Sequence, residues 1–378
     1  MLRSVVADFK DAGNEVTVLL DARLSKLNPP LKATYKVPIF YPKEIEKFLN
    51  NTNKIIDSIY IIAPETRQSL QSLVKLAEQT GNVSLNCESD AIGKVTNKAI
   101  LYKILHKNSF STPKMLLFNF TDCLMKVKQV IKRELNYPVV LKPVAGIGCS
   151  GISVVNEDSQ IQKAIDKVEA VSKNANFIVQ EFIKGESASI SLLSTGKKAQ
   201  AISLNKQNVN LAETDGYSSY DGGWVPYEHP LQHEAFDLAE KLIESFQGLR
   251  GYVGVDLVLS HDKPYVLDVN PRLTTSYVGL RKVVNFNVAG ALLNSVLNGK
   301  LPIKYKNRDT ACFSKIETSV PTVRVFEKTI ELDIVVSPPF PLENNTKSCA
   351  LVIGKGDNLD NARKHLEEAK KNLLTIIS

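Results

Sequence analysis

The stretch Tyr252–Arg272 reads YVGVDLVLSHDKPYVLDVNPR and holds two apolar runs around a polar turn. Alternation of apolar and polar residues with a period of two predicts two β-strands joined as a hairpin. If these strands pair antiparallel, Asp256 and Asp268 lie side by side on one face, and Asn270 shares that face. Two like charges held this close repel each other, so the pattern is easiest to explain if a cation lies between them.

The oxygen-rich composition of this set indicates a hard divalent cation. Two carboxylates and one amide suit Mg²⁺, with Mn²⁺ as an alternative, and such an ion takes further ligands from water and phosphates. Arg272 follows directly and offers a planar fork for a phosphate or a carboxylate. The alternative is a solvated acidic hairpin, which is disfavoured because Asp268 lies inside VLDVN and not in the turn.

A glycine-rich stretch, Tyr137–Val155, reads YPVVLKPVAGIGCSGISVV and contains the pattern GxGxxG. A dinucleotide-binding fingerprint requires a helix after the glycines, whereas residues 152–155, ISVV, predict a strand. Strand, glycine loop and strand together predict a flap whose backbone N–H groups close over phosphates. The candidate phosphate-binding residues of this flap are Gly146, Gly148, Ser150 and Gly151.

Lys142 lies on the strand before the glycine loop and is expected to project toward the same phosphates. With Arg272 it is our candidate for stabilising charge during catalysis. The chain contains no GxxxxGK[ST] sequence, which argues against a P-loop enzyme. A glycine-rich hairpin with an incidental lysine is the alternative.

A third stretch, Phe177–Ser191, predicts a strand, a turn at Lys184-Gly185 and a second strand. Such a turn can present backbone groups to an adenine edge while an apolar side chain covers the ring. Glu186 just beyond it is placed to accept ribose hydroxyls. By itself this stretch is also compatible with an ordinary hairpin. The adenine candidates are Gln180, Glu181, Phe182 and Ile183.

In their order, these pieces resemble the ATP-grasp superfamily of carboxylate–amine ligases. An earlier lysine, Lys98 in NKAILYKILHKNSFSTP, resembles the first nucleotide lysine of that family, with Asn97 where the family usually has Asp. The resemblance covers roughly residues 95–310. It implies an α/β and α+β architecture, in which two α+β lobes enclose ATP behind a small Rossmann-like parallel-sheet domain. The residues that resemble the family's magnesium ligands are Asp256, Asp268 and Asn270.

Three segments are expected along the chain: a Rossmann-like domain over residues 1–94, the ATP-grasp domain over 95–310 and a small α+β domain over 311–378. In the first, we expect a helix over Met1–Ala12 and strands over Glu15–Leu20, Lys54–Ala63 and Val83–Cys87. The opening strand usual for this domain is missing, so the domain is expected to be reduced or trimmed at its start.

Composition agrees with a globular enzyme. The chain has 378 residues, of which 43% are hydrophobic and 23% charged, enough for two or three packed units. The net charge of +7 is spread without an Arg-rich block, so we expect anionic small-molecule ligands and no nucleic acid. Five dispersed cysteines without a CxxC pair and the short apolar runs predict a cytoplasmic protein without a membrane partner. A homodimer is left open.

The segment Asn205–Pro230 is the best sequence clue to the substrate. Its polar and glycine content predicts a loop, and its aromatic residues suit either a mobile lid over the acyl-transfer site or packing onto their own domain. Tyr220 and Trp224 are the substrate candidates here. Residues 274–281 are a second candidate, although their hydroxyls suit a helix cap equally well.

The whole-chain pattern resembles the archaeal-type tyramine–glutamate ligase group within the superfamily. That resemblance implies an acid, glutamate, and an amine, tyramine, that are joined through an acyl phosphate with release of ADP and phosphate. Arg281 and Lys282 are then candidates for holding the α-carboxylate of the acid. Three rivals stay open: a biotin-carboxylase-like enzyme with a separate carrier, an inactive ATP-binding protein and, least favoured, a Rossmann oxidoreductase.

Overall fold

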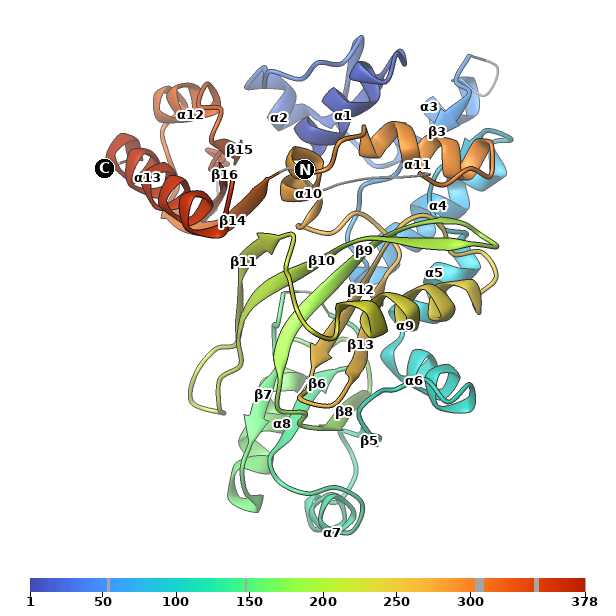
Figure 1. Ribbon diagram of the computed structural model, residues 1–378, viewed down its shortest axis with the longest axis vertical. Helices are drawn as coiled ribbons and strands as arrows, with labels where there is room; N and C mark the ends of the chain where they lie inside the picture. The colour runs from blue at the N-terminus through green and yellow to red at the C-terminus, as the bar shows by residue number, and fades with distance from the viewer. Residues whose placement is uncertain (53–54, 147, 303–308, 343–346, 378) are drawn as a thin grey trace.

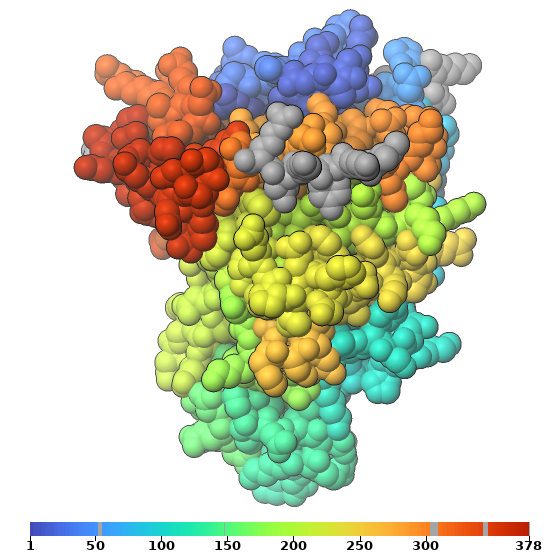
Figure 2. Space-filling model, viewed as in Figure 1, coloured from blue at the N-terminus to red at the C-terminus, as the bar shows by residue number. Residues whose placement is uncertain are grey.

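A computed structural model describes residues 1–52, 55–146, 148–302, 309–342 and 347–377 of the chain. A small four-stranded lobe occupies one end of its long axis, and the N-terminal and C-terminal segments occupy the other end (Figures 1 and 2). An eight-stranded sheet lies between them. This arrangement places an N-terminal α/β segment and two sheet-containing parts in one molecule, as the sequence predicts.

The N-terminal segment contains helices and two separate pairs of parallel strands. β1 pairs with β2 and β3 pairs with β4, so the expected parallel sheet is present as two short pieces. Its elements are α1 (Leu2–Asp11), β1 (Thr17–Asp21), α2 (Ala22–Lys26), β2 (Tyr35–Ile39), α3 (Lys43–Thr52), β3 (Ser58–Ile59), η1 (Thr66–Gln68), α4 (Ser69–Gln79), β4 (Val83–Ser84) and α5 (Ser89–Thr96).

The strands predicted over Lys54–Ala63 and Val83–Cys87 are much shorter in the structure, and Lys54 lies outside the described residues. Beyond the paired residues, a side chain replaces the strand partner. The Asn86 amide donates to the carbonyl of Ile61 at 2.9 Å, and its Oδ1 accepts from the N–H of Ile61 at 2.7 Å. Both backbone groups of Ile61 are therefore satisfied without a ladder.

The small lobe is a four-stranded antiparallel sheet in the order β5-β8-β6-β7, covered on one face by two helices. Leu141 and Val179 point into the core beneath these helices. Because side chains alternate along a strand, Lys142 and Gln180 point to the opposite face. The elements are α6 (Lys98–Lys107), β5 (Met115–Asn119), α7 (Leu124–Glu134), β6 (Val139–Pro143), β7 (Ser153–Val155), η2 (Asp158–Gln160), α8 (Ile161–Glu169) and β8 (Asn176–Glu181).

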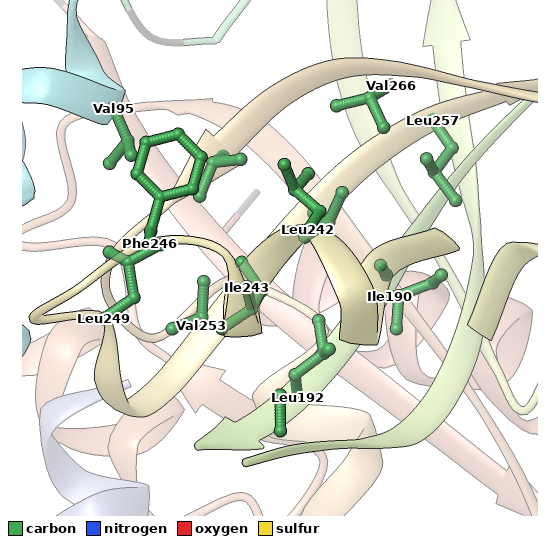
Figure 3. Packing of buried hydrophobic residues seen from close by; sticks show 14 of the residues in the cluster. Val95, Ile190, Leu192, Leu242, Ile243, Phe246, Leu249, Val253, Leu257 and Val266 are labelled. Atoms are coloured by element: carbon green, nitrogen blue, oxygen red, sulfur yellow. The ribbon is translucent and has the colours of Figure 1, made fainter. Parts of the chain in front are cut away.

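The large sheet has the strand order β13-β12-β9-β10-β11-β14-β16-β15. One face packs against α9, where Ile190 and Leu192 of β9 meet Leu242 and Ile243 (Figure 3). The residues that alternate with these along β9 point to the other face of the sheet, on which Asp256 and Asp268 lie. The elements up to α11 are β9 (Glu186–Thr195), β10 (Ala199–Asn210), β11 (Ser219–Val225), α9 (Gln232–Glu244), β12 (Arg250–Leu259), β13 (Pro264–Asn270), α10 (Tyr277–Val283) and α11 (Val288–Leu297).

The C-terminal strands extend this same sheet. β14 pairs with β11, opposing Cys312 to Trp224, and β16 and β15 follow at the edge. A boundary at residue 310 therefore does not separate two sheets, and the domain division stays a prediction. The remaining elements are β14 (Thr310–Ser319), α12 (Val323–Ile330), β15 (Val335–Ser337), β16 (Lys347–Gly356) and α13 (Leu359–Ile377).

Candidate active site

The predicted carboxylate pair is formed by the register of β12 and β13. Asp256 lies opposite Asp268, and Asn270 lies opposite Gly254, two positions along the same face. The Asn270 amide donates to Asp256 Oδ2 at 2.9 Å. The expectation that these three side chains converge is confirmed, and β10 adds one that sequence reasoning missed: Gln207, whose amide donates to Asp256 Oδ1 at 3.0 Å.

Asp256 carries its charge in an unfavourable environment. The pKa of this carboxyl is raised to about 6, chiefly by burial and secondly by the neighbouring charge of Asp268, while the amides of Asn270 and Gln207 act in the opposite direction. The donor set consists of carboxylate and amide oxygens on one face. A hard divalent cation fits this set, because it would offset the repulsion between the two carboxylates.

Lys98 joins this pair from the start of α6. Its ammonium group forms an ion pair with Asp268, and the two side chains are 13% and 21% exposed. Asn97 caps the helix, since its Oδ1 accepts from the backbone N–H groups of Ala99 at 3.1 Å and Ile100 at 3.2 Å. Asn97 therefore caps the helix whose first residue, Lys98, reaches the site.

Lys142 is the second lysine of the cluster and is only 6% exposed. The pKa of its ammonium group is lowered to about 7, chiefly by burial and secondly by the like charge of Lys98. The charges of Asp268 and Asp256 act in the opposite direction. A buried lysine of this kind is stabilised in its charged form when an anion binds beside it.

The glycine loop connects two antiparallel strands, β6 and β7, as predicted. No helix follows the glycines, which argues against a Rossmann dinucleotide site. Gly148 and Gly151 have φ values of +64° and +75°, which glycine adopts at little cost. Gly146 and Ser150 lie in the same loop, and its Ile147 lies outside the described residues.

The predicted adenine hinge is the connection between β8 and β9. Gln180 is buried, and the backbone N–H of Glu181 donates to the carbonyl of Lys114 at 2.9 Å. The Glu181 carboxylate in turn accepts from the N–H of Lys114 at 3.1 Å. The N–H groups of Glu181 and Lys114 are therefore both used within the fold, and Phe182 and Ile183 follow Glu181 in the connection.

Glu186, the ribose candidate, borders a hollow of about 420 Å³ whose other walls include Lys206, Gln207 and Asp221. Its Oε2 accepts from Lys206 Nζ at 2.8 Å and from the Tyr227 hydroxyl at 2.5 Å. These two hydrogen bonds lower the pKa of the carboxyl. Its Oε1 lies 3.9 Å from Nε2 of His229.

Arg272 lies at the end of the metal hairpin and is held by the N-terminal segment. Its Nε donates to Glu65 Oε1 at 2.6 Å, and its Nη1 donates to the carbonyl of Leu273 at 3.0 Å. Glu65 was not a candidate from the sequence, where it follows Pro64 without any motif. Only the packing of the two segments reveals this contact.

The prediction of a loop over Asn205–Pro230 is wrong for half of the segment, because residues 205–210 belong to β10 and residues 219–225 to β11 of the large sheet. Trp224 packs toward the C-terminal segment: its ring lies 4.9 Å from Arg363 Cζ and 5.8 Å from the ring of Tyr227. Trp224 therefore follows the alternative in which the aromatic residues of this segment pack within the protein and do not form a lid. For Tyr220, burial raises the pKa of the phenol, and the charge of Asp256 acts in the same direction.

Arg281, the candidate for the acid's α-carboxylate, already has a carboxylate partner. One edge of its guanidinium group meets Asp8 of α1 in a bidentate contact, with Nε donating to Oδ2 at 2.7 Å and Nη2 paired with Oδ1. Tyr277 also donates to Asp8 Oδ2, at 2.5 Å. The structure thus ties Arg281 to the N-terminal segment, and a substrate role for it would require exchange of this partner.

Comparisons with known proteins show the family to which the chain belongs. The ATP-grasp domain family matches residues 95–276, and the pre-ATP-grasp 3 domain family matches residues 14–92. Tyramine–L-glutamate ligase of Methanocaldococcus fervens is 30% identical over 269 residues, which are 71% of this chain and 76% of that protein. The chain belongs to the ATP-grasp superfamily.

Within that superfamily it is an ADP-forming carboxylate–amine ligase that binds ATP. The enzyme of the same name from Methanocaldococcus jannaschii is also 30% identical, over 71% of this chain and 73% of its own length.

Solved ATP-grasp structures share the fold over nearly the whole chain. An ATP-grasp superfamily protein from Archaeoglobus fulgidus has a TM-score of 0.61 at 24% identity, covering 93% of this chain and 90% of its own. The biotin carboxylase domain of Hydrogenobacter thermophilus 2-oxoglutarate carboxylase, solved with MgADP and bicarbonate, has a TM-score of 0.73 at 12% identity, covering 97% and 86%. Such distant likeness establishes the architecture alone. Among the described residues of our ATP-grasp ligase, no helix is long and apolar enough to cross a membrane.

Proposed function

We propose that this ligase joins glutamate, through its γ-carboxylate, to an aromatic primary amine such as tyramine, by way of an acyl phosphate. The observation that carries the proposal is the convergence of Asp256 and Asp268 with Lys98 and Lys142 across two lobes. A site of paired carboxylates and buried lysines suits a polyphosphate with a bound cation. The relatives' names supply the acid and the amine.

In this proposal ATP lies between the small lobe and the polar face of the large sheet. Phe182 and Ile183 would meet the adenine, and Glu186 the ribose. Lys98, Lys142 and the flap from Gly146 to Gly151 would contact the phosphates, with the flap closing over them. Opening of such a flap exchanges the nucleotide, and closure excludes water from a reactive acyl phosphate.

Asp256, Asp268 and Asn270 would hold Mg²⁺, with Mn²⁺ as the alternative. When bound, the ion supplies neutralisation of phosphate charge. The protein's own part is positioning: Lys142 and Arg272 would stabilise the γ-phosphoryl group as the substrate carboxylate attacks it. Attack of the amine on the resulting acyl phosphate then gives the amide and inorganic phosphate. No side-chain nucleophile is required.

The substrate pocket is expected on the side of the metal hairpin where Tyr220 and the 274–281 segment lie. Thr274 and Ser276 take part in a hydroxyl network with Tyr252, whose OH lies 3.1 Å from Thr274 Oγ1. Arg281 stays our proposal for the α-carboxylate, with exchange of its partner Asp8 as the necessary step. Trp224 is a weaker candidate because its ring is already packed.

The test is ADP release with ATP and Mg²⁺ against a panel of acids and amines, with the amide identified by mass spectrometry. We expect ADP and amide in equal amounts with glutamate and tyramine. ADP formed with another acid would overturn the substrate assignment and keep the ligase. ADP release that requires bicarbonate would instead support the carboxylase alternative. Light scattering on the same preparation decides whether the protein is a homodimer.

A further inference from the structure

We propose that Glu65 is a positioning residue for Arg272, so that the N-terminal segment takes part in the ligase reaction. This inference rests on the proposed role of Arg272 at the transferred phosphoryl group. The two side chains meet through Arg272 Nε and Glu65 Oε1 at 2.6 Å and are 23% and 12% exposed. The pair joins residues 207 positions apart in the chain.

The arginine is held on two of its edges. Nε meets Glu65, and Nη1 donates to the carbonyl of Leu273 at 3.0 Å, which leaves Nη2 without a hydrogen bond to any described residue. A planar guanidinium fixed at two nitrogens has little rotational freedom. The remaining edge is therefore oriented before an anionic group arrives, which lowers the entropic cost of binding that group.

The carboxylate of Glu65 has no other described partner. Its Oε2 is buried and accepts no hydrogen bond within the described parts of the chain. A buried carboxylate oxygen without a donor is costly, and such an atom calls for an explanation in function. A carboxylate whose one ion pair within the described ranges is with Arg272 fits the role of orienting that arginine.

The backbone around Glu65 is held in an unusual conformation. Arg67 and Gln68 both have left-handed φ values, +54° and +57°, although neither is glycine. Each such residue costs about 1–3 kcal/mol and persists where the surroundings fix it. The preceding chain is fixed by the paired hydrogen bonds between Asn86 and Ile61. The backbone on both sides of Glu65 is therefore fixed, as the role of orienting another side chain requires.

The experiment is a double-mutant cycle on turnover with Glu65→Ala, Arg272→Ala and the double variant. We expect Glu65→Ala to lower kcat by about 10- to 100-fold while ATP binding changes less than about twofold, since a misplaced arginine loses its contact in the transition state. In the Arg272→Ala background the same change should have no further effect on kcat. Glu65→Gln, which keeps an acceptor for Nε, should recover part of the loss.

Glu78→Ala is the matched control. Glu78 is another N-terminal glutamate, whose carboxylate accepts from the N–H and the hydroxyl of Ser89 at 2.9 and 2.6 Å, and no hydrogen bond within the described residues joins it to Arg272. Any decrease in kcat caused by Glu78→Ala should be the same in the wild-type and the Arg272→Ala backgrounds. The proposal would be overturned if Glu65→Ala lowered kcat by the same factor in the Arg272→Ala background as in the wild type. Full activity of the Glu65→Ala variant would overturn it as well.

A second readout separates this inference from the choice of substrate. Binding of ADP with aluminium fluoride, which mimics the transferring phosphoryl group, needs no acid or amine. We expect Glu65→Ala to weaken this complex about tenfold or more, and to weaken ADP alone by less than about twofold. Equal effects on both would overturn the positioning role even if glutamate proves to be the wrong acid.

Discussion

The small lobe and the large sheet bring opposite charges to one site, and burial acts against both. In the small lobe, burial lowers the pKa of Lys142 to about 7, with Lys98 as a second, like-charged cause. In the large sheet, burial raises the pKa of Asp256 to about 6, with Asp268 as the second cause. Each side of the site therefore carries a pair of like charges.

The difference between the two sides matches the two parts of a metal nucleotide. The paired lysines favour an anion, and the paired carboxylates favour a cation. One contact links the two pairs: the ion pair of Lys98 with Asp268. A cation bound between the carboxylates would relieve their repulsion, and phosphates bound beside the lysines would relieve theirs. Burial of these charges, which is unfavourable in the empty site, therefore favours binding of a metal nucleotide.

The strongest test of the carboxylate side is Asp268→Asn. We expect turnover to fall by about two orders of magnitude or more, because one charge of the cation site is lost. Steady-state ADP release measures the effect, and thermal unfolding checks the fold. Asp262→Asn, in the exposed turn of the same hairpin, is the control and should keep full activity. A fully active Asp268→Asn enzyme would remove the metal assignment.

On the lysine side, Lys142→Met keeps the length of the side chain and removes its charge. We expect ATP to bind about 10- to 100-fold more weakly, the equivalent of one charge-assisted contact of about 1.5–3 kcal/mol. Isothermal titration calorimetry with a non-hydrolysable ATP analogue gives the affinity. Unchanged affinity would show that the phosphates lie away from β6.

The pH dependence of kcat/KM for ATP sharpens the comparison of the two sides. Below pH about 6, Asp256 is protonated and the cation site weakens, so kcat/KM should rise as pH increases through this value. Above pH about 7, Lys142 loses its proton, so binding an anion requires proton uptake. The value should then fall by up to about tenfold per pH unit. The Lys142→Met variant should not show this decrease of kcat/KM at alkaline pH. If the decrease persists in the variant, another group causes it.

The smallest expected effect on catalysis belongs to Trp224→Ala. Its ring packs on Arg363 and Tyr227, so we expect a loss of about 2–4 kcal/mol in the free energy of unfolding and a change below about twofold in either substrate KM. Denaturant unfolding and kinetics measure the two quantities. Tyr217→Ala, at a residue that is 86% exposed, should alter neither. A large rise in the KM of the amine with unchanged stability would restore Trp224 to the substrate site.

Local patterns were sufficient where a short-range rule applies. The alternation around Asp256 and Asp268 predicts their register because side chains repeat with a period of two. The strand after Gly151 was predictable for the same reason. The prediction failed for β10 and β11, where glycines and polar residues suggested a loop. Gly223 is there because a Cβ would lie 1.9 Å from the carbonyl oxygen of Lys206 on the neighbouring strand, a demand of close backbone approach.

The sequence by itself determined the strands that carry the carboxylates, the glycine loop between strands and the order of the nucleotide residues, because each depends on residues near one another in the chain. Only the tertiary structure decided that Gln207 reaches Asp256, that Asp8 holds Arg281 and that Glu65 meets Arg272. These partners come from segments whose approach is set by packing of the whole fold. Long-range contacts of this kind leave no periodic signal in the chain, so no local pattern could have revealed them.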